Sequence, residues 1–102
     1  MRDCGKLLLI KENGNRVGMI KLLERPEAIE IGEIQIEPSA QGRGLGSLIL
    51  RDTIAQAHAQ GKSVWLSTGL KNDRARRLYL RLGFREVDRS DTHRRFVFEP
   101  PG

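Results

Sequence analysis

Hydrophobic and polar residues alternate along the first third of the chain, which predicts three β-strands before any helix. The first two strands, over residues 7–11 and 16–23, flank Asn13-Gly14-Asn15, a sequence typical of the tight turn of a β-hairpin. The third strand, over residues 28–37, follows a break at Arg25-Pro26. The pattern therefore predicts a hairpin followed by a third strand.

The apolar positions of the third strand change phase in its middle. They are odd-numbered at Ile29 and Ile31 but even-numbered at Ile34 and Ile36. One extra residue in a strand turns every later side chain to the other face, and glycine favours such an insertion. We therefore predict a β-bulge at Gly32-Glu33.

Helical spacing of apolar residues appears only after a glycine-rich turn in the middle of the chain. The remaining elements, in order, are a helix ending at about Gln60, a strand over residues 63–67, a helix from Asn72 or Asp73 to Leu82, and a hairpin over residues 84–88 and 93–98. The predicted order is βββαβαββ. It describes an α+β fold in which a mixed, mostly antiparallel sheet packs against two helices.

Length and composition limit the fold and its location. A chain of 102 residues can bury one hydrophobic core, so residues 1–102 are expected to form a single domain. The sequence has no run of the roughly 20 apolar residues that cross a bilayer, and Leu7–Ile10 is too short for a signal peptide. We expect a cytoplasmic protein without membrane contact. The single cysteine, Cys4, excludes disulfides, and no metal site is expected.

Arginine supplies most of the positive charge, and the net charge is +5. The last third of the chain is especially basic, with Arg74, Arg76, Arg77, Arg81, Arg85, Arg89, Arg94 and Arg95. Because guanidinium groups pair with phosphate and carboxylate, the cluster suits a solvated surface, a small phosphate-bearing molecule or an acidic partner. Nucleic acid is disfavoured, because the few aromatic residues follow the core pattern and no nucleic-acid-binding motif is present.

The glycine-rich turn, residues 42–46, stands between a strand and a helix, where a phosphate-binding loop is found in many folds. The first N–H groups of a helix are unpaired, and the helix dipole attracts anions. A dinucleotide fingerprint would need glycine where this chain has Ser47, and the Gly-Lys-Ser/Thr sequence of a nucleoside triphosphate loop is absent. The turn therefore predicts an anion site of another kind.

Two segments carry a family resemblance. Gln41-Gly42-Arg43-Gly44-Leu45-Gly46 follows the pattern Gln/Arg-x-x-Gly-x-Gly/Ala, and residues 72–84, NDRARRLYLRLGF, follow the pattern Asn-x-x-Ala-x-x-Leu-Tyr-x-x-x-Gly-Phe. In this order and spacing they resemble the pyrophosphate loop and a later helix of the GNAT N-acetyltransferases. The resemblance covers residues 28–98 well.

The resemblance implies an N-acetyltransferase that moves an acetyl group from acetyl-CoA directly to a primary amine on a protein N-terminus, a lysine or a small molecule. In such an enzyme Tyr79 would be the general acid for the departing thiolate, and Glu33 could act as a base through water. A free N–H at the phase slip would stabilise the oxyanion. The residues that would bind acetyl-CoA are Ile34, Gln35, Ile36, Gln41, Gly42, Arg43, Gly44, Leu45, Gly46, Ser47 and Asn72.

The chain departs from the family pattern in two ways. Ser67 stands where relatives that acetylate protein N-termini often carry a glutamate base. The family's usual first strand and helices have no counterpart before the hairpin, so we expect an acceptor side that is open or closed by the second subunit of a homodimer. These departures keep open an alternative, a non-catalytic CoA-binding module that regulates a partner protein. The acceptor amine also stays open.

Overall fold

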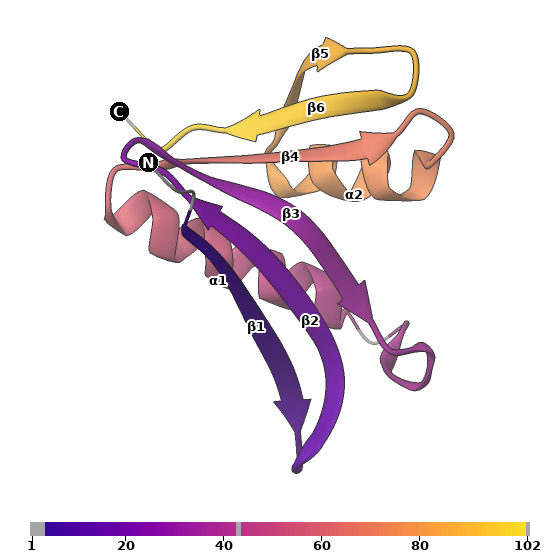
Figure 1. Cartoon of the computed structure of the whole chain (residues 1–102). Helices are drawn as coiled ribbons and strands as arrows, with labels where there is room; N and C mark the ends of the chain where they lie inside the picture. The colour runs from indigo at the N-terminus through magenta and orange to yellow at the C-terminus, as the bar shows by residue number, and fades with distance from the viewer. Residues whose placement is uncertain (1–3, 43, 102) are drawn as a thin grey trace.

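The computed structural model describes residues 4–42 and 44–101, which form six strands, two α-helices and one short 3-10 helix (Figure 1). The order of strands and α-helices is the predicted βββαβαββ. The elements are β1 (Cys4–Glu12), β2 (Asn15–Glu24), β3 (Ala28–Ile36), η1 (Pro38–Ala40), α1 (Leu45–Ala59), β4 (Ser63–Gly69), α2 (Asp73–Leu82), β5 (Arg85–Arg89) and β6 (His93–Phe98).

All six strands belong to one sheet, in the order β1-β2-β3-β4-β6-β5. Neighbouring strands are antiparallel, except that β3 and β4 are parallel and are connected through α1. Both helices lie against the same face of the sheet (Figure 1). The predicted α+β fold, with a mixed and mostly antiparallel sheet, is therefore confirmed.

The hydrophobic core fills the space between this face and the two helices. Leu50 of α1 and Tyr79 of α2 pack into one cluster with Val64, Leu66 and Phe96 of the central strands. Leu50, Val64 and Phe96 are almost completely buried. Burying one such side chain stabilises the fold by about 1.5–3 kcal/mol, so these residues fix how the helices sit on the sheet.

The end of α2 depends on a glycine. Gly83 has a φ of 115°, a left-handed conformation that L side chains rarely adopt, and its N–H bonds to the carbonyl of Leu80. A Cβ atom at this position would lie 2.8 Å from the ring of Phe98. The chain can therefore reverse here and bring Phe84 into the core only if residue 83 is glycine.

The predicted bulge is present in β3. Lys21 of β2 lies opposite Glu33, but the next residue, Leu22, lies opposite Ile31, so Gly32 is the additional residue. The insertion keeps both Ile31 and Ile34 in contact with the core despite their different parity.

Beyond this bulge, β3 and β4 separate. Their parallel pairing runs from Ala28 and Ser63 to Ile31 and Leu66, where it ends. The rest of β3 pairs with β2 alone, and β4 continues along β6, so the two strands diverge (Figure 1).

Among the described residues, no helix is long and apolar enough to cross a membrane. The same part of the chain holds no group of three or more His, Cys, Asp and Glu side chains that could bind a metal ion.

Candidate active site

A cavity of about 680 Å³ lies where β3 ends, between the N-terminus of α1 and one side of α2. Most of the described residues predicted to bind the cofactor line it: Ile36, Gln41, Gly42, Gly44, Leu45, Gly46, Ser47 and Asn72. Arg43 belongs to the same loop in sequence but lies outside the described residues. Segments that are far apart in the sequence thus meet around one cavity.

The glycine-rich loop exposes its backbone to this cavity. Gly42 and Gly44 have φ values of 84° and 74°, which place both in the left-handed region. Gly44 is the N-cap of α1, and its carbonyl accepts the first helical hydrogen bond from Leu48 N at 3.1 Å. The N–H groups of the first helical turn have no partner within the helix, so they can bind an anion in the cavity.

Gln41 holds this loop against the end of β3. Its side-chain Nε2 donates a hydrogen bond to the carbonyl oxygen of Ile36 at 3.0 Å. The bond links the loop to the strand edge that precedes it, so this side chain has a structural partner in addition to its place on the cavity wall.

Asn72 forms the other wall together with α2. Its Oδ1 accepts a hydrogen bond from Ala75 N at 3.1 Å, which makes it the side-chain cap of this helix. Asp73, in the first turn, adds a favourable interaction with the helix dipole. The cap fixes where α2 begins and therefore how its next turns face the loop.

Three arginines of α2 complete the cavity. Arg74, Arg77 and Arg81 line it and form no ion pair with any described residue. From the sequence alone, the basic residues of this region were predicted as one cluster, and the row formed by these three was not identified. The signal was available, since the spacings of three and seven residues place all three on one side of a helix.

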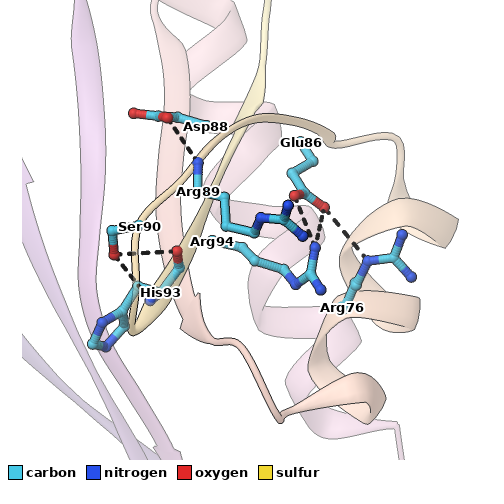
Figure 2. A network of polar contacts seen from close by, with 7 residues as sticks. All are labelled: Arg76, Glu86, Asp88, Arg89, Ser90, His93 and Arg94. Atoms are coloured by element: carbon cyan, nitrogen blue, oxygen red, sulfur yellow. Dashed lines mark hydrogen bonds and ion pairs between the residues drawn. The ribbon is translucent and has the colours of Figure 1, made fainter.

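The neighbouring Arg76 points to a different partner (Figure 2). Its Nε lies 3.5 Å from Glu86 Oε1, and Arg94 donates to the same carboxylate at 3.0 Å. Desolvation raises the pKa of Glu86, but hydrogen bonding and charge attraction from Arg94, and then from Arg76, outweigh it and leave the pKa lowered. This network ties α2 to the β5-β6 hairpin and is separate from the cavity.

Tyr79, the predicted general acid, is 7% exposed and packs between the rings of Phe84 and Phe96, at 5.9 and 5.6 Å. Its hydroxyl makes no hydrogen bond within the part of the chain that the structure describes. Burial raises the pKa of Tyr79 above its ordinary value of 10, so the group is protonated at neutral pH. The ring does not line the cavity; its helix neighbours Ala75 and Leu78 do.

The predicted strand residues lie along the diverging part of β3. Ile34, Gln35 and Ile36 pair with β2 on one side, and no described strand pairs with them on the other. Glu33 is exposed and accepts a hydrogen bond from the Gln35 side chain. Ser67 lies on the opposite side of the divergence, in register with Arg95, whose guanidinium stacks 4.9 Å from the centre of the Trp65 ring.

Comparison with known proteins agrees with this arrangement. Residues 1–84 match the model of the acetyltransferase (GNAT) family. The chain belongs to this family. The matched residues include the glycine-rich loop and α2.

Among curated relatives, the chain is 33% identical over 95 residues to an uncharacterized N-acetyltransferase of Methanocaldococcus jannaschii, covering 85% of this chain and 42% of that protein. It is 37% identical over 62 residues to the N-alpha-acetyltransferase RimI of Mycobacterium tuberculosis, covering 61% of this chain and 38% of RimI. The chain thus spans less than half the length of either relative.

A GNAT acetyltransferase from Elizabethkingia anophelis, crystallised with acetyl-CoA bound, superposes with a TM-score of 0.84 at 24% identity. The match covers 93% of this chain and 76% of that one. This similarity supports the fold.

Proposed function

We propose that the protein is an acetyl-CoA-dependent N-acetyltransferase that moves an acetyl group directly to a primary amine. The observation that carries the proposal is the cavity of about 680 Å³, in which a glycine-rich loop, a helix N-terminus and an arginine row face one another beside an unpaired strand edge. The N-acetyltransferase relatives, and the acetyl-CoA bound to the structural neighbour, support the same reaction.

The residues of the cavity fit a diphosphate donor. A Cβ atom added at Gly42, Gly44 or Gly46 would meet no protein atom within 4 Å, so the absence of side chains there keeps space open over the backbone. The first N–H groups of α1 would bind the pyrophosphate, and Arg74, Arg77 and Arg81 would balance its charge. The edge of Ile34–Ile36 would hold the pantetheine amides as an additional strand does.

The chemistry then requires a neutral amine, an oxyanion donor and a proton for the leaving group. As the amine nitrogen bonds to the acetyl carbon, the carbon–sulfur bond breaks and the thiolate takes up a proton. We assign that proton to Tyr79, whose hydroxyl has no other described partner. A main-chain N–H at the bulge, at Gly32 or Glu33, would stabilise the oxyanion.

The amine proton has no strong acceptor in this proposal. Ser67 cannot act as a carboxylate base, and Glu33, already hydrogen-bonded to Gln35, would act through water. As part of the same proposal, residues 1–102 form one acetyltransferase domain that works in the cytoplasm. The acceptor is a primary amine of a protein N-terminus, a lysine or a small molecule.

One observation favours a second candidate, a CoA-binding module that regulates a partner protein. Tyr79 is buried and does not line the cavity, so the donor could bind without access to the proposed acid. Such a module would use the loop and the arginine row but would have no use for the Tyr79 hydroxyl.

Two measurements separate these functions. Acetyl-CoA binding is measured by calorimetry, and release of free CoA thiol is measured over peptides with free N-termini, lysine peptides and small amines. The proposed enzyme binds acetyl-CoA and releases CoA only when an acceptor is present, with a matching mass increase of that acceptor. Binding without transfer to any class of amine would support the module, and absence of binding would overturn both functions.

A further inference from the structure

Both α-helices begin at the same end of the sheet. Helix α1 connects β3 to β4, and α2 connects β4 to β5. Strands β4 and β5 are both antiparallel to β6, and β3 is parallel to β4, so all three run in one direction and each helix returns antiparallel to the strand before it (Figure 1). The positive ends of both helix dipoles therefore lie where β3 and β4 end, beside the cavity of about 680 Å³.

The wall of this cavity carries positive charge without a balancing carboxylate. Among the described residues that line it, Arg74, Arg77 and Arg81 are charged and none is acidic. By contrast, a groove of about 790 Å³ lined by β1, β2 and α1 has charges of both signs. The three arginines, the arginine row, are exposed and form no ion pair with a described residue, so they are available to a bound anion.

The arginine row extends further than a pyrophosphate does. Arg74 and Arg81 are seven residues apart, and the rise of an α-helix separates their Cα atoms by about 10 Å along the axis. The two phosphorus atoms of a pyrophosphate share one bridging oxygen, and in the proposed function the first N–H groups of α1 bind this group. An anion that meets the row along its whole length must therefore carry a further negative group.

We propose that the arginine row binds the 3′-phosphate of CoA and makes the protein selective for CoA over dephospho-CoA. The ribose of CoA separates this phosphate from the pyrophosphate, so the ligand has two anionic groups, and the cavity has two positive regions. The 3′-phosphate is a monoester whose second ionisation has a pKa of about 6, so at neutral pH it carries nearly two negative charges. Guanidinium groups bind its oxygens in pairs. The inference rests on the proposed function, which supplies the CoA-bearing donor.

The two sides of α2 differ in whether their arginines have a carboxylate partner. Arg76 lies 3.5 Å from Glu86, whereas Arg77, the next residue, lines the cavity and has no such partner among the described residues. Because the guanidinium groups of the row are exposed, salt screens their attraction for a phosphate. The selectivity for CoA should therefore be largest at low ionic strength and should shrink as salt is added.

Binding of CoA and dephospho-CoA, which differ only in this phosphate, tests the inference. In calorimetry at low salt, the wild type should bind CoA at least about fivefold more tightly, as one or more exposed ion pairs can provide. In the triple variant Arg74→Gln, Arg77→Gln, Arg81→Gln the ratio of the two Kd values should approach one. Any contribution of the row to pyrophosphate binding affects both ligands alike and cancels in this ratio. Phosphorus NMR should show the monoester signal of CoA shifted by the wild type but not by the triple variant.

A second triple variant is the matched control. Arg16→Gln, Arg85→Gln, Arg89→Gln removes the same charge from exposed positions that do not line the cavity, and it should keep the wild-type ratio. Both triple variants should keep the wild-type circular dichroism spectrum, because every substituted arginine is exposed. Equal wild-type affinity for CoA and dephospho-CoA, or selectivity that survives in the variant of the row, would overturn this inference and leave the proposed function intact. Absence of binding of either ligand would overturn both.

Discussion

The side chain of Gln41 donates a hydrogen bond to the carbonyl oxygen of Ile36 at 3.0 Å. This bond joins the last residue of β3 to the loop before α1 and bridges the tight turn of η1. Both residues line the cavity of about 680 Å³, so the bond holds the strand edge and the glycine-rich loop in a fixed relation.

Replacing Gln41 should weaken donor binding without unfolding the chain. Removing one such hydrogen bond costs about 0.5–1.5 kcal/mol, so Gln41→Leu should raise the acetyl-CoA Kd by roughly 2- to 12-fold. Gln56→Leu removes a comparable exposed bond, to Asp52 on α1, and should leave the Kd unchanged. Calorimetry of both variants checks the prediction, and equal affinities would assign Gln41 no role in the loop.

Acetyl-CoA binding should depend on the glycines of the loop for two reasons. They adopt left-handed backbone conformations, and they have no side chains that would fill the cavity. Gly44→Val adds a side chain at a φ of 74° beside the cavity, and we expect the affinity for acetyl-CoA to fall at least about tenfold. Gly61→Val introduces the same strain at a φ of 72°, at the far end of α1. The acetyl-CoA affinity of Gly61→Val should match that of the wild type, while its Tm falls. If Gly44→Val and Gly61→Val lose affinity equally, the loss reflects lower stability of the fold and not a role of Gly44 in binding.

Only the arginines on the side of α2 that lines the cavity should contribute to acetyl-CoA binding. Arg77→Gln or Arg81→Gln should weaken acetyl-CoA binding by about 2- to 5-fold at low salt, and the loss should shrink as salt screens the exposed guanidinium. Arg76→Gln is the matched control, because Arg76 is paired with Glu86. It should lower Tm and leave the Kd unchanged. If all three variants bind alike, the arginine row does not contact the donor.

Replacing Tyr79 should lower turnover and leave acetyl-CoA binding unchanged. In Tyr79→Phe the ring can keep its contacts with Phe84 and Phe96, so the fold and the acetyl-CoA Kd should be preserved. Loss of a general acid lowers kcat by about 100- to 10,000-fold. The wild type and the variant are compared on one proven acceptor, with Kd measured in parallel. Unchanged kcat would make Tyr79 a core residue and favour the regulatory module.

The sequence predicted the parts of the fold that local pattern determines. The phase change at Gly32 predicted the position of the bulge, and Asn72 and Gly83 predicted the ends of α2. Both features depend on backbone conformations that neighbouring residues determine. The length of β1 was underestimated. Gly5, Lys6 and Glu12 lie outside the predicted residues 7–11 but continue the ladder by pairing with Leu23, Leu22 and Asn15, although they carry no apolar signal.

The candidate site was less predictable where it depends on packing between distant elements. The bond from Gln41 to Ile36 requires the turn of η1 to bring the two together, which no periodicity indicates. Arg76 and Arg77 are adjacent in sequence, yet one meets Glu86 and the other meets the cavity, because the position of the β5-β6 hairpin decides which side of α2 finds a carboxylate. The burial of Tyr79 likewise follows from the placement of Phe84 and Phe96.

The pH dependence should be set by the acceptor. In the proposed reaction, Ser67 stands where some relatives carry a glutamate base, so transfer would depend on an amine that arrives neutral. An α-amino group with a pKa of about 8 is neutral at pH 7.5 in roughly a quarter of molecules, whereas a lysine amine with a pKa near 10.4 is neutral in about one in a thousand. Acceptors of low pKa should therefore be preferred, and kcat/KM should rise along the titration of the acceptor itself.

The proposed general acid, Tyr79, should not limit the rate at neutral or mildly alkaline pH. Because burial raises the pKa of Tyr79 above its ordinary value of 10, the hydroxyl keeps its proton from neutral pH up to about pH 9, and kcat/KM should not decline over that interval. The profile is measured with two acceptors whose amines differ in pKa, and the midpoint should move with the acceptor. If kcat/KM instead reaches a plateau near pH 7 with both acceptors, and Glu33→Gln abolishes the plateau, then Glu33 acts as a base. The argument for a preference for amines of low pKa would then fail.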